Sequence, residues 1–188
     1  VEQAKVEVKK DIDEQNDIDF EAMKLMDLQV SDATPLPQSK LDNLRENILK
    51  ASPTALEYIY QRVKDLRHDV SKENRQRQSQ SQDIIKGRVE RTIPIFQALI
   101  ESEYGKESHR YYAQLGYALK DYALEDKDDL KTDALGKARY SLNKAIELWQ
   151  ERNSDATNLP PLYCFNWAEC DAKLLEPSVL RLEEIQWR

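Results

Sequence analysis

The chain has 188 residues, and a domain of this size buries about 68–70% of the surface that its unfolded chain exposes. It is 40% hydrophobic and 34% charged, with four glycines and seven prolines, and its many unbranched side chains favour helix over sheet. A net charge of −7 disfavours general binding to a nucleic-acid backbone, and no run approaches the ~20 apolar residues of a membrane span.

The opening residues, 1–30, are acidic with scattered apolar side chains. Asp19 is expected to cap a short helix in which Phe20, Met23 and Leu28 form an apolar stripe. Upstream, residues 5–9 alternate as in a strand, but a lone strand has nothing to pair with. A frayed tail is the simpler interpretation of this upstream part.

A linker follows at residues 31–39, because Pro35 and Pro37 push the residues before them out of helical geometry. We therefore expect an acidic N-terminal segment with its linker at 1–38 and a helical domain at 39–188. The chain begins with Val1 rather than methionine, and its last amphipathic segment stops at Arg188. We expect a piece of a longer protein that is truncated at its C-terminal end.

Two helices are predicted after the linker. Ser39 is expected to cap the first, and Ser52 with Pro53 in the first turn is typical of the start of the second. The first carries apolar residues on one side, namely Leu41, Leu44, Ile48 and Leu49. The second has one apolar stripe over its turns, at Leu56, Ile59, Val63, Leu66 and Val70. The polar tract at 74–82 is expected to be a loop or an exposed helix extension.

Four further helical stretches follow, at about 83–104, 108–124, 132–152 and 160–176. Pro94 should kink the first of them or mark its true start, because proline removes a backbone hydrogen bond and clashes with the preceding turn. Gly105 is expected to end it. Pro177 is expected to begin a last amphipathic segment.

Residues 112–119 resemble the first-helix signature of the tetratricopeptide repeat, which is a large aromatic, then Leu-Gly, then a large residue three positions later. Tyr112, Leu115, Gly116 and Leu119 supply it. The second-helix signature is a small residue, a large one four later and alanine three beyond that, and it is supplied by Ala138, Leu142 and Ala145. The small residues let two antiparallel helices approach closely. The resemblance implies an all-α fold of antiparallel helical hairpins, stacked as a short, irregular α-solenoid.

The repeat is degenerate. A second unit begins at Cys164, but Trp167-Ala168 stands in place of Leu-Gly and Asp171 in place of a large residue. Tyr112 and Cys164 are 52 positions apart, whereas the family repeats every ~34 residues. The excess falls in two loops, one before Ala138 and one after Ala145.

The resemblance also implies a peptide-binding groove, because in this family one side of the first helices lines a concave surface. By matching positions, the groove residues are Arg110, Tyr117, Lys120, Asp121, Phe165, Glu169 and Lys173. Tyrosine and arginine are common binding hot spots. An alternative for the tyrosines is that they lie on the surface and cover loops.

A local basic excess gives a second hypothesis. Residues 61–91 hold nine Lys/Arg against five Asp/Glu. A stripe along this stretch would contact phosphates in a nucleic-acid-binding module, through Arg62, Lys64, Arg67, Lys72, Arg75 and Arg77. No aromatic residue interleaves after Tyr60, however, and acidic residues dilute the field. The simpler interpretation is a solvated helix face.

Catalytic and metal-binding patterns are missing from the sequence. The two histidines, His68 and His109, are not in a metal-binding spacing, and no glycine loop suits a phosphate. Cys164 and Cys170 lie on different faces of one predicted helix, so free thiols in a reducing cytoplasm are expected. The acidic stretch at 121–133 lacks the alternation of a calcium loop and is expected to be a solvated insertion.

We therefore expect a cytoplasmic, non-enzymatic adaptor or regulatory module of a larger protein. It would bind a protein or peptide partner, or another domain of the same polypeptide, without a cofactor, metal or membrane. Nucleic-acid contact through residues 61–91 is the alternative function.

Overall fold

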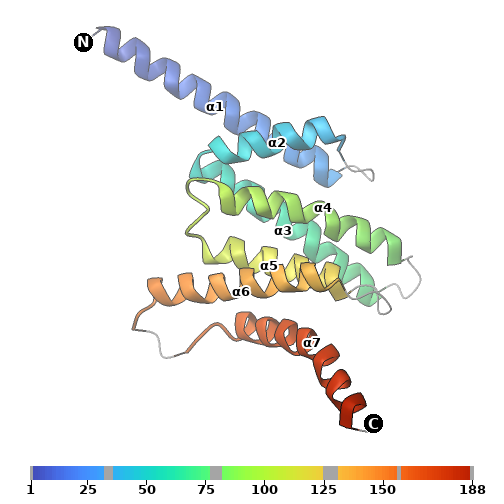
Figure 1. The fold of residues 1–188 in the computed structure, drawn as a ribbon. Coiled ribbons are helices and arrows are strands. Elements are labelled where there is room, and N and C mark those ends of the chain that lie inside the picture. Colours follow the sequence, from blue (N-terminus) through green and yellow to red (C-terminus); the bar gives the residue numbers. More distant parts are fainter. Residues whose placement is uncertain (1, 32–35, 77–81, 125–130, 156–157, 187–188) are drawn as a thin grey trace. The chain divides into compact units, whose positions relative to one another are not determined.

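Seven α-helices make up the part of the chain that the computed structural model describes, residues 2–31, 36–76, 82–124, 131–155 and 158–186, and no strand occurs there (Figure 1). Side chains are described for residues 7, 9–31, 36–67, 87, 89–124, 131–155 and 158–175. In chain order the helices are α1 (Glu2–Ser31), α2 (Gln38–Lys50), α3 (Pro53–Gln76), α4 (Gln82–Glu101), α5 (His109–Leu124), α6 (Thr132–Arg152) and α7 (Pro161–Gln186). The all-helical prediction is confirmed for these residues. Among the described helices, none combines the length and the apolar character that a membrane crossing requires.

The helices form two compact units, which are described separately. The first comprises Val1–Ser81 and Pro94–Glu107, and the second comprises Gln82–Ile93 and Ser108–Arg188. Helix α4 therefore contributes to both units. The expected division at residue 38 does not follow these units, because α1 packs against both α2 and α3 within the first.

In the first unit, α1 is one continuous helix, so the prediction of a short helix that starts at Asp19 was wrong, and residues 5–9 are helical, neither a strand nor a frayed tail. Its buried side chains are Ala22, Leu25, Met26 and Gln29, which recur at helical spacing and face the unit's core. The predicted stripe at Phe20, Met23 and Leu28 is not the core face, since Phe20 is 65% exposed. The first half of α1 projects beyond α2 and α3 (Figure 1), and the described side chains before Gln15 are exposed.

Asp19 caps the start of α3 rather than that of its own helix. Its carboxylate accepts a hydrogen bond from the Ser52 backbone N–H at 2.9 Å and another from the Ser52 hydroxyl. The Ser52 Oγ also accepts a hydrogen bond from the Ala55 N–H at 3.3 Å, and α3 begins at Pro53, so the predicted start of this helix is confirmed. Asp19 thus ties α1 to the first turn of α3.

The apolar stripe predicted for α3 is confirmed at every position with a described side chain, because Leu56, Ile59, Val63 and Leu66 are buried. Val70 lies outside the described side chains. Leu44 and Ile48 of α2 are also buried, whereas Leu41 is only half-buried and Leu49 is 36% exposed. Residue 37, not Ser39, precedes the first turn of α2, and it makes no side-chain cap.

In the second unit, α5, α6 and α7 run antiparallel in chain order, and α6 packs against both of the others (Figure 1). The predicted crossing of α5 and α6 is confirmed in detail. A Cβ on Gly116 would stand 2.6 Å from Leu142 Cγ and 3.2 Å from the Ala138 carbonyl oxygen. Ala138, Leu142 and Ala145 are fully buried. The helices approach so closely because Gly116 has no side chain.

The structure bears on the expectations for Pro94, Pro177 and Gly105. Helix α4 continues through Pro94, which is therefore not its true start, and the alternative of a kink there stays a prediction. Helix α7 continues through Pro177 instead of beginning a new segment there. Helix α4 ends at Glu101, before Gly105. A Cβ at Gly105 would lie 1.8 Å from the Leu99 carbonyl oxygen, so only glycine fits this turn.

Candidate functional site

The groove predicted on α5 is occupied at its centre by α7. Tyr117, expected to be exposed, is only 8% exposed. Its ring stands edge-on to the ring of Tyr163 on α7, with 6.4 Å between the centroids and 62° between the planes. The prediction of an exposed Tyr117 was therefore wrong, because α7 covers this side of α5 and the aromatic ring is buried against it.

Two other predicted groove residues pair across the same contact. Lys120 Nζ of α5 lies 2.5 Å from a carboxylate oxygen of Glu169 on α7, and their side chains are 13% and 35% exposed. His109 at the start of α5 lies 2.9 Å, through Nδ1, from the Tyr163 hydroxyl. The resemblance placed Lys120 and Glu169 on one binding surface. The structure brings these two residues together, but as a half-buried ion pair between α5 and α7.

The remaining predicted groove residues are divided between this contact and open surface. Asp121 and Lys173 are half-buried, and each takes part in further interactions. Arg110 is exposed, and it too has interactions. Phe165 is 66% exposed. Phe165 is thus the large apolar residue of the predicted set that the structure leaves uncovered.

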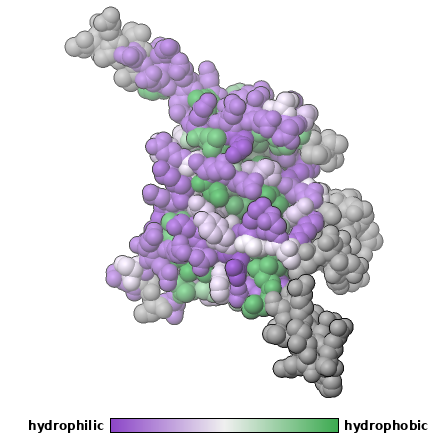
Figure 2. Space-filling view, in the orientation of Figure 1, coloured by the Kyte–Doolittle hydropathy of each residue, from purple (hydrophilic) through white to green (hydrophobic). Residues whose placement is uncertain are grey.

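Phe165 belongs to an apolar face of α7 that we call the α7 open face. It comprises side chains at spacings of three or four residues, namely Leu162, Phe165, Ala168, Ala172 and Leu175. Leu162 is 68% exposed and Leu175 is 54% exposed. Green, hydrophobic atoms are visible at the level of α7 in the lower part of Figure 2. This face is large and apolar, yet no other described element covers these side chains.

The opposite face of α7 holds the helix in place. Cys170 is completely buried, and Tyr163, Trp167 and Leu174 are half-buried. Asp171, which replaces the large residue of the repeat signature, accepts a hydrogen bond from Arg139 of α6 at 2.6 Å. Helix α7 is therefore anchored to both α5 and α6, and its open face is presented on a supported helix.

Two titratable groups at this contact have shifted pKa values. Burial raises the pKa of the Cys170 thiol to about 11, so its nucleophilic thiolate is scarce at neutral pH. Burial, with Arg152 and Arg110 nearby, lowers the pKa of His109, which favours its neutral form. The His109 side chain is half-buried. No cluster of metal-ligating side chains occurs among the described residues.

The basic stretch proposed for nucleic acid is only partly described. Arg62 is engaged by Asp27 of α1, with its Nε 2.9 Å from a carboxylate oxygen. Lys64 and Arg67 are half-buried on α3. Lys72, Arg75 and Arg77 lie outside the described side chains. Among the described basic side chains named for this stretch, Arg62 is thus ion-paired and Lys64 and Arg67 are only partly exposed, and nucleic-acid contact stays a prediction.

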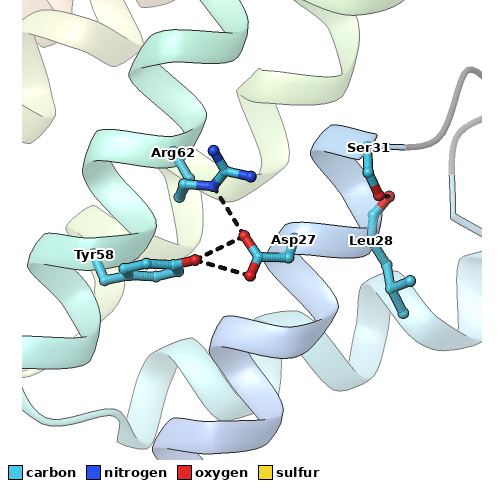
Figure 3. A network of polar contacts seen from close by, with 5 residues as sticks. All are labelled: Asp27, Leu28, Ser31, Tyr58 and Arg62. Carbon is cyan, nitrogen blue, oxygen red and sulfur yellow. Dashed lines mark hydrogen bonds and ion pairs between the residues drawn. The ribbon is translucent and has the colours of Figure 1, made fainter.

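Arg62 also lines a groove of the first unit, which lies between α1 and α3 and has a volume of about 670 Å³. We call it the α1–α3 groove. Its apolar lining includes Phe20, Met23 and Leu28, the residues of the stripe predicted for α1, and its polar lining includes Asp27, Tyr58 and Arg62. Figure 3 shows the polar residues converging: the Tyr58 hydroxyl donates to Asp27, 2.8 Å from each carboxylate oxygen.

Sequence reasoning missed both surfaces for identifiable reasons. Leu162 and Leu175 repeat with Phe165 at helical spacing, but this spacing does not show whether another helix covers the face. The pairing of Asp27 with Tyr58 was missed because it joins α1 to α3 across 31 positions of the sequence. The stripe at Phe20, Met23 and Leu28 was a usable signal, since a tail has no reason to carry apolar residues on one face.

Comparisons with known proteins add no relative. No family model, curated protein or solved structure matches the chain. What the chain does is therefore inferred from the two surfaces described above.

Proposed function

We propose that the chain is a non-catalytic protein–protein interaction module of the adaptor type, which binds an amphipathic helix of a partner protein on the α7 open face. The observation that carries this proposal is the exposure of Leu162, Phe165 and Leu175, each more than half exposed, along one side of a helix whose other side is anchored. Contiguous apolar surface of this kind marks interaction sites.

The energetic gain from covering this face is substantial. Fully burying a Leu or Phe side chain contributes about 1.5–3 kcal/mol, so burying the exposed parts of Leu162, Phe165 and Leu175 contributes roughly 1–2 kcal/mol each. Together these terms give roughly 3–6 kcal/mol, whereas a micromolar complex needs about 8 kcal/mol net of the entropy lost on association, so the apolar side chains of the partner helix and the contacts around the face supply the rest. An anchored helix adds to this, because little ordering is needed when the partner binds.

A helix is the partner structure that suits this face. Side chains spaced three and four residues apart on α7 form ridges and grooves into which those of another helix fit. The end face of a stack of helical pairs is polar when it is left uncovered, and this one is apolar. A covering helix from another protein, or from another domain of the same polypeptide, satisfies both requirements.

The proposal extends to the repeat architecture of the second unit and to the cellular location of the protein. We propose that α5, α6 and α7 are one and a half units of a degenerate, tetratricopeptide-like stack, which the close packing of Gly116 against Leu142 supports. A reducing location such as the cytoplasm is supported by the two free thiols, Cys164 and Cys170. The proposed binding surface is therefore the open face of α7 and not the side of α5 predicted from the resemblance, where Tyr117 is covered.

The proposal is tested by selecting helical peptides that bind the chain. A phage-displayed library of amphipathic helical peptides is panned on the full chain, and the affinity of enriched peptides is measured by fluorescence anisotropy. Phe165→Asp should weaken binding at least tenfold, because a carboxylate would be buried in the apolar contact.

The matched control is Tyr140→Asp, which places the same charge at a 69% exposed aromatic residue of α6, away from the α7 open face. This variant should bind as the unaltered chain does, and circular dichroism should show that both variants remain helical. Equal affinity of all three proteins for every enriched peptide, or no enrichment at all, would contradict the proposal.

A further inference from the structure

Each unit of the chain carries an apolar surface that no described element covers, the α1–α3 groove in the first unit and the α7 open face in the second. The α7 open face is the outer side of one helix, whereas the groove lies between two helices and holds about 670 Å³. An amphipathic helix laid into a hydrophobic groove is a recurring mode of protein recognition. One chain therefore carries both the helix and the groove that such a contact needs.

The polar side chains that line the α1–α3 groove are bonded within the chain. The Asp27 carboxylate accepts a hydrogen bond from Arg62 Nε at 2.9 Å and one from the Tyr58 hydroxyl at 2.8 Å (Figure 3). The other polar lining residues have partners on α1, Lys24 with Glu21 at 3.0 Å and Ser31 with the Leu28 carbonyl oxygen. Each lining charge thus has an opposite charge beside it, so the groove suits an uncharged, apolar occupant rather than a counter-ion.

The carboxylates that border the α7 open face are bonded in the same way. Glu169 pairs with Lys120 of α5, and Asp171 accepts a hydrogen bond from Arg139 of α6 at 2.6 Å. An apolar surface laid on this face would leave neither carboxylate without its partner, which is the condition for covering charged groups without a large loss. The α7 open face and the α1–α3 groove therefore match in polarity.

The two surfaces also match in relief. Phe20 is 65% exposed at the groove, where it forms part of the lining. On the α7 open face two small exposed residues, Ala168 and Ala172, lie between the larger Phe165 and Leu175. Helices pack when the large side chains of one enter the spaces between large side chains of the other. Phe20 of one copy thus fits over the two alanines of another copy, whose Phe165 then faces the groove.

The lengths of the two surfaces agree. From Leu162 to Leu175 the α7 open face is about 20 Å long, and from Phe20 to Ser31 the α1 side of the groove is about 17 Å long. A contact of this length, made by one helix face, belongs to the small interfaces of less than about 1,200 Å², whose complexes are weak and transient. We therefore expect a dissociation constant on the order of 100 µM.

We propose that the chain associates with itself head to tail, with the α7 open face of one copy lying in the α1–α3 groove of the next. This inference rests on the proposed function, because it takes the α7 open face as a helix-binding surface and names α1 of a second copy, with α3 beside it, as what covers that face. The contact joins two different surfaces, so each copy keeps one surface for a further copy.

Self-association is tested by sedimentation equilibrium on the unaltered full chain, from about 10 µM to 1 mM. About 0.3 M salt screens the repulsion between chains whose net charge is −7. The average mass should rise above that of one copy as the concentration increases. A mass of one copy over the whole range would overturn the proposal.

Two variants show which surfaces meet. Phe165→Asp disables the α7 open face and Phe20→Asp disables the groove, because each places a carboxylate in an apolar contact. Each variant alone should associate at least tenfold more weakly than the unaltered chain. An equimolar mixture should regain the association and stop at two copies, because the groove of Phe165→Asp and the α7 open face of Phe20→Asp are both intact.

Two results of this experiment would refute the head-to-tail contact. If either variant alone associates as the unaltered chain does, two like surfaces meet instead of two unlike ones. If the mixture forms no species of two copies, the intact groove and the intact face do not bind each other. Recovery in the mixture also shows that both variants are folded, and circular dichroism of each variant alone checks this independently.

Matched controls place the same charge at an exposed aromatic residue elsewhere in each unit. Tyr104→Asp alters a 57% exposed residue of the first unit, and Tyr140→Asp alters a 69% exposed residue of the second. Both variants should associate as the unaltered chain does. A tenfold weakening in either control would show that the loss in Phe20→Asp or Phe165→Asp is not specific to the two surfaces, and the assignment would fail.

Helical peptides selected on the α7 open face separate this inference from the proposed function. Such a peptide should dissociate the copies, because both occupy the same face. If the peptide binds the unaltered chain but the mass stays that of one copy throughout, the proposed function stands and the partner is not a second copy. If the copies associate and a bound peptide leaves their association unchanged, the contact does not involve the α7 open face and the inference fails.

Discussion

Replacing Gly116 with alanine should destabilise the second unit, although alanine is the better helix former. The new Cβ would stand 2.6 Å from Leu142 Cγ, whereas carbon atoms in favourable contact are about 3.5–4.0 Å apart, so Leu142 would have to move by roughly 1 Å. Leu142 is fully buried and has little room to do so. The Ala138 carbonyl oxygen, at 3.2 Å, belongs to the backbone and yields still less.

The expected magnitude follows from two opposing terms. Overpacking of a well-packed core costs about 1–3 kcal/mol, and replacing a helical glycine by alanine gains about 1 kcal/mol. The net loss for Gly116→Ala is therefore up to about 2 kcal/mol in the free energy of unfolding. Gly136 provides the control, since it lies within α6 and a Cβ there would meet no atom within 4 Å. Gly136→Ala should gain about 0.5–1 kcal/mol.

Urea unfolding followed by circular dichroism measures both variants against the unaltered chain, with the midpoint and slope fitted separately. Because the chain forms two units, fluorescence of the tryptophans, which lie in α6, α7 and residues 187–188, reports on the second unit alone. If Gly116→Ala proves as stabilising as Gly136→Ala, the close crossing of α5 and α6 does not exist in solution and the packing argument fails.

Three other predictions concern the contact of α5 and α6 with α7. Cys164, which is half-buried, should react with a thiol reagent at neutral pH well before Cys170, because burial and a pKa of about 11 both slow the reaction of Cys170. Cys164→Ser should remove the fast phase of the reaction, and equal rates for the two thiols would contradict the prediction. The pKa of His109 is lowered in the folded chain, so its contribution to stability is present above its unfolded pKa of about 6.5 and is lost as the pH falls toward and through its folded pKa. Unfolding experiments between pH 7.5 and 5 should therefore show a decline in the free energy of unfolding that is shallower in His109→Gln. A double-mutant cycle on Lys120→Met and Glu169→Gln should give a coupling of about 0.5–1 kcal/mol that shrinks in high salt, and zero coupling at low salt would show that the pair does not form.

Helix positions and the α5–α6 crossing were predictable because both follow from local rules. Thr132–Arg152 was expected as a helix and is observed with the same bounds, and the start of α3 at Pro53 followed from Ser52. The small residues Gly116, Ala138 and Ala145 predicted a close crossing, because small side chains at a helix contact let the two helices approach closely.

The predictions that failed depend on contacts distant in sequence. Nothing local distinguishes Tyr117 on an open groove from Tyr117 buried against Tyr163, because the difference lies in where α7 packs. Asp19 had the correct chemistry for a helix cap, but its partner was Ser52, 33 residues away. Pro177 shows the opposite limit: a residue that disfavours helix locally lies within α7, as tertiary context can require.

The proposed role of the α7 open face is tested most directly by locating a bound peptide on the full chain. A helical peptide selected on the unaltered protein is labelled with a nitroxide, and the broadening of leucine methyl signals is measured by NMR. We predict that, among the leucines of the second unit, the methyl signals of Leu162 and Leu175 broaden most. Broadening centred on any other surface, with Leu162 and Leu175 unchanged, would contradict the account.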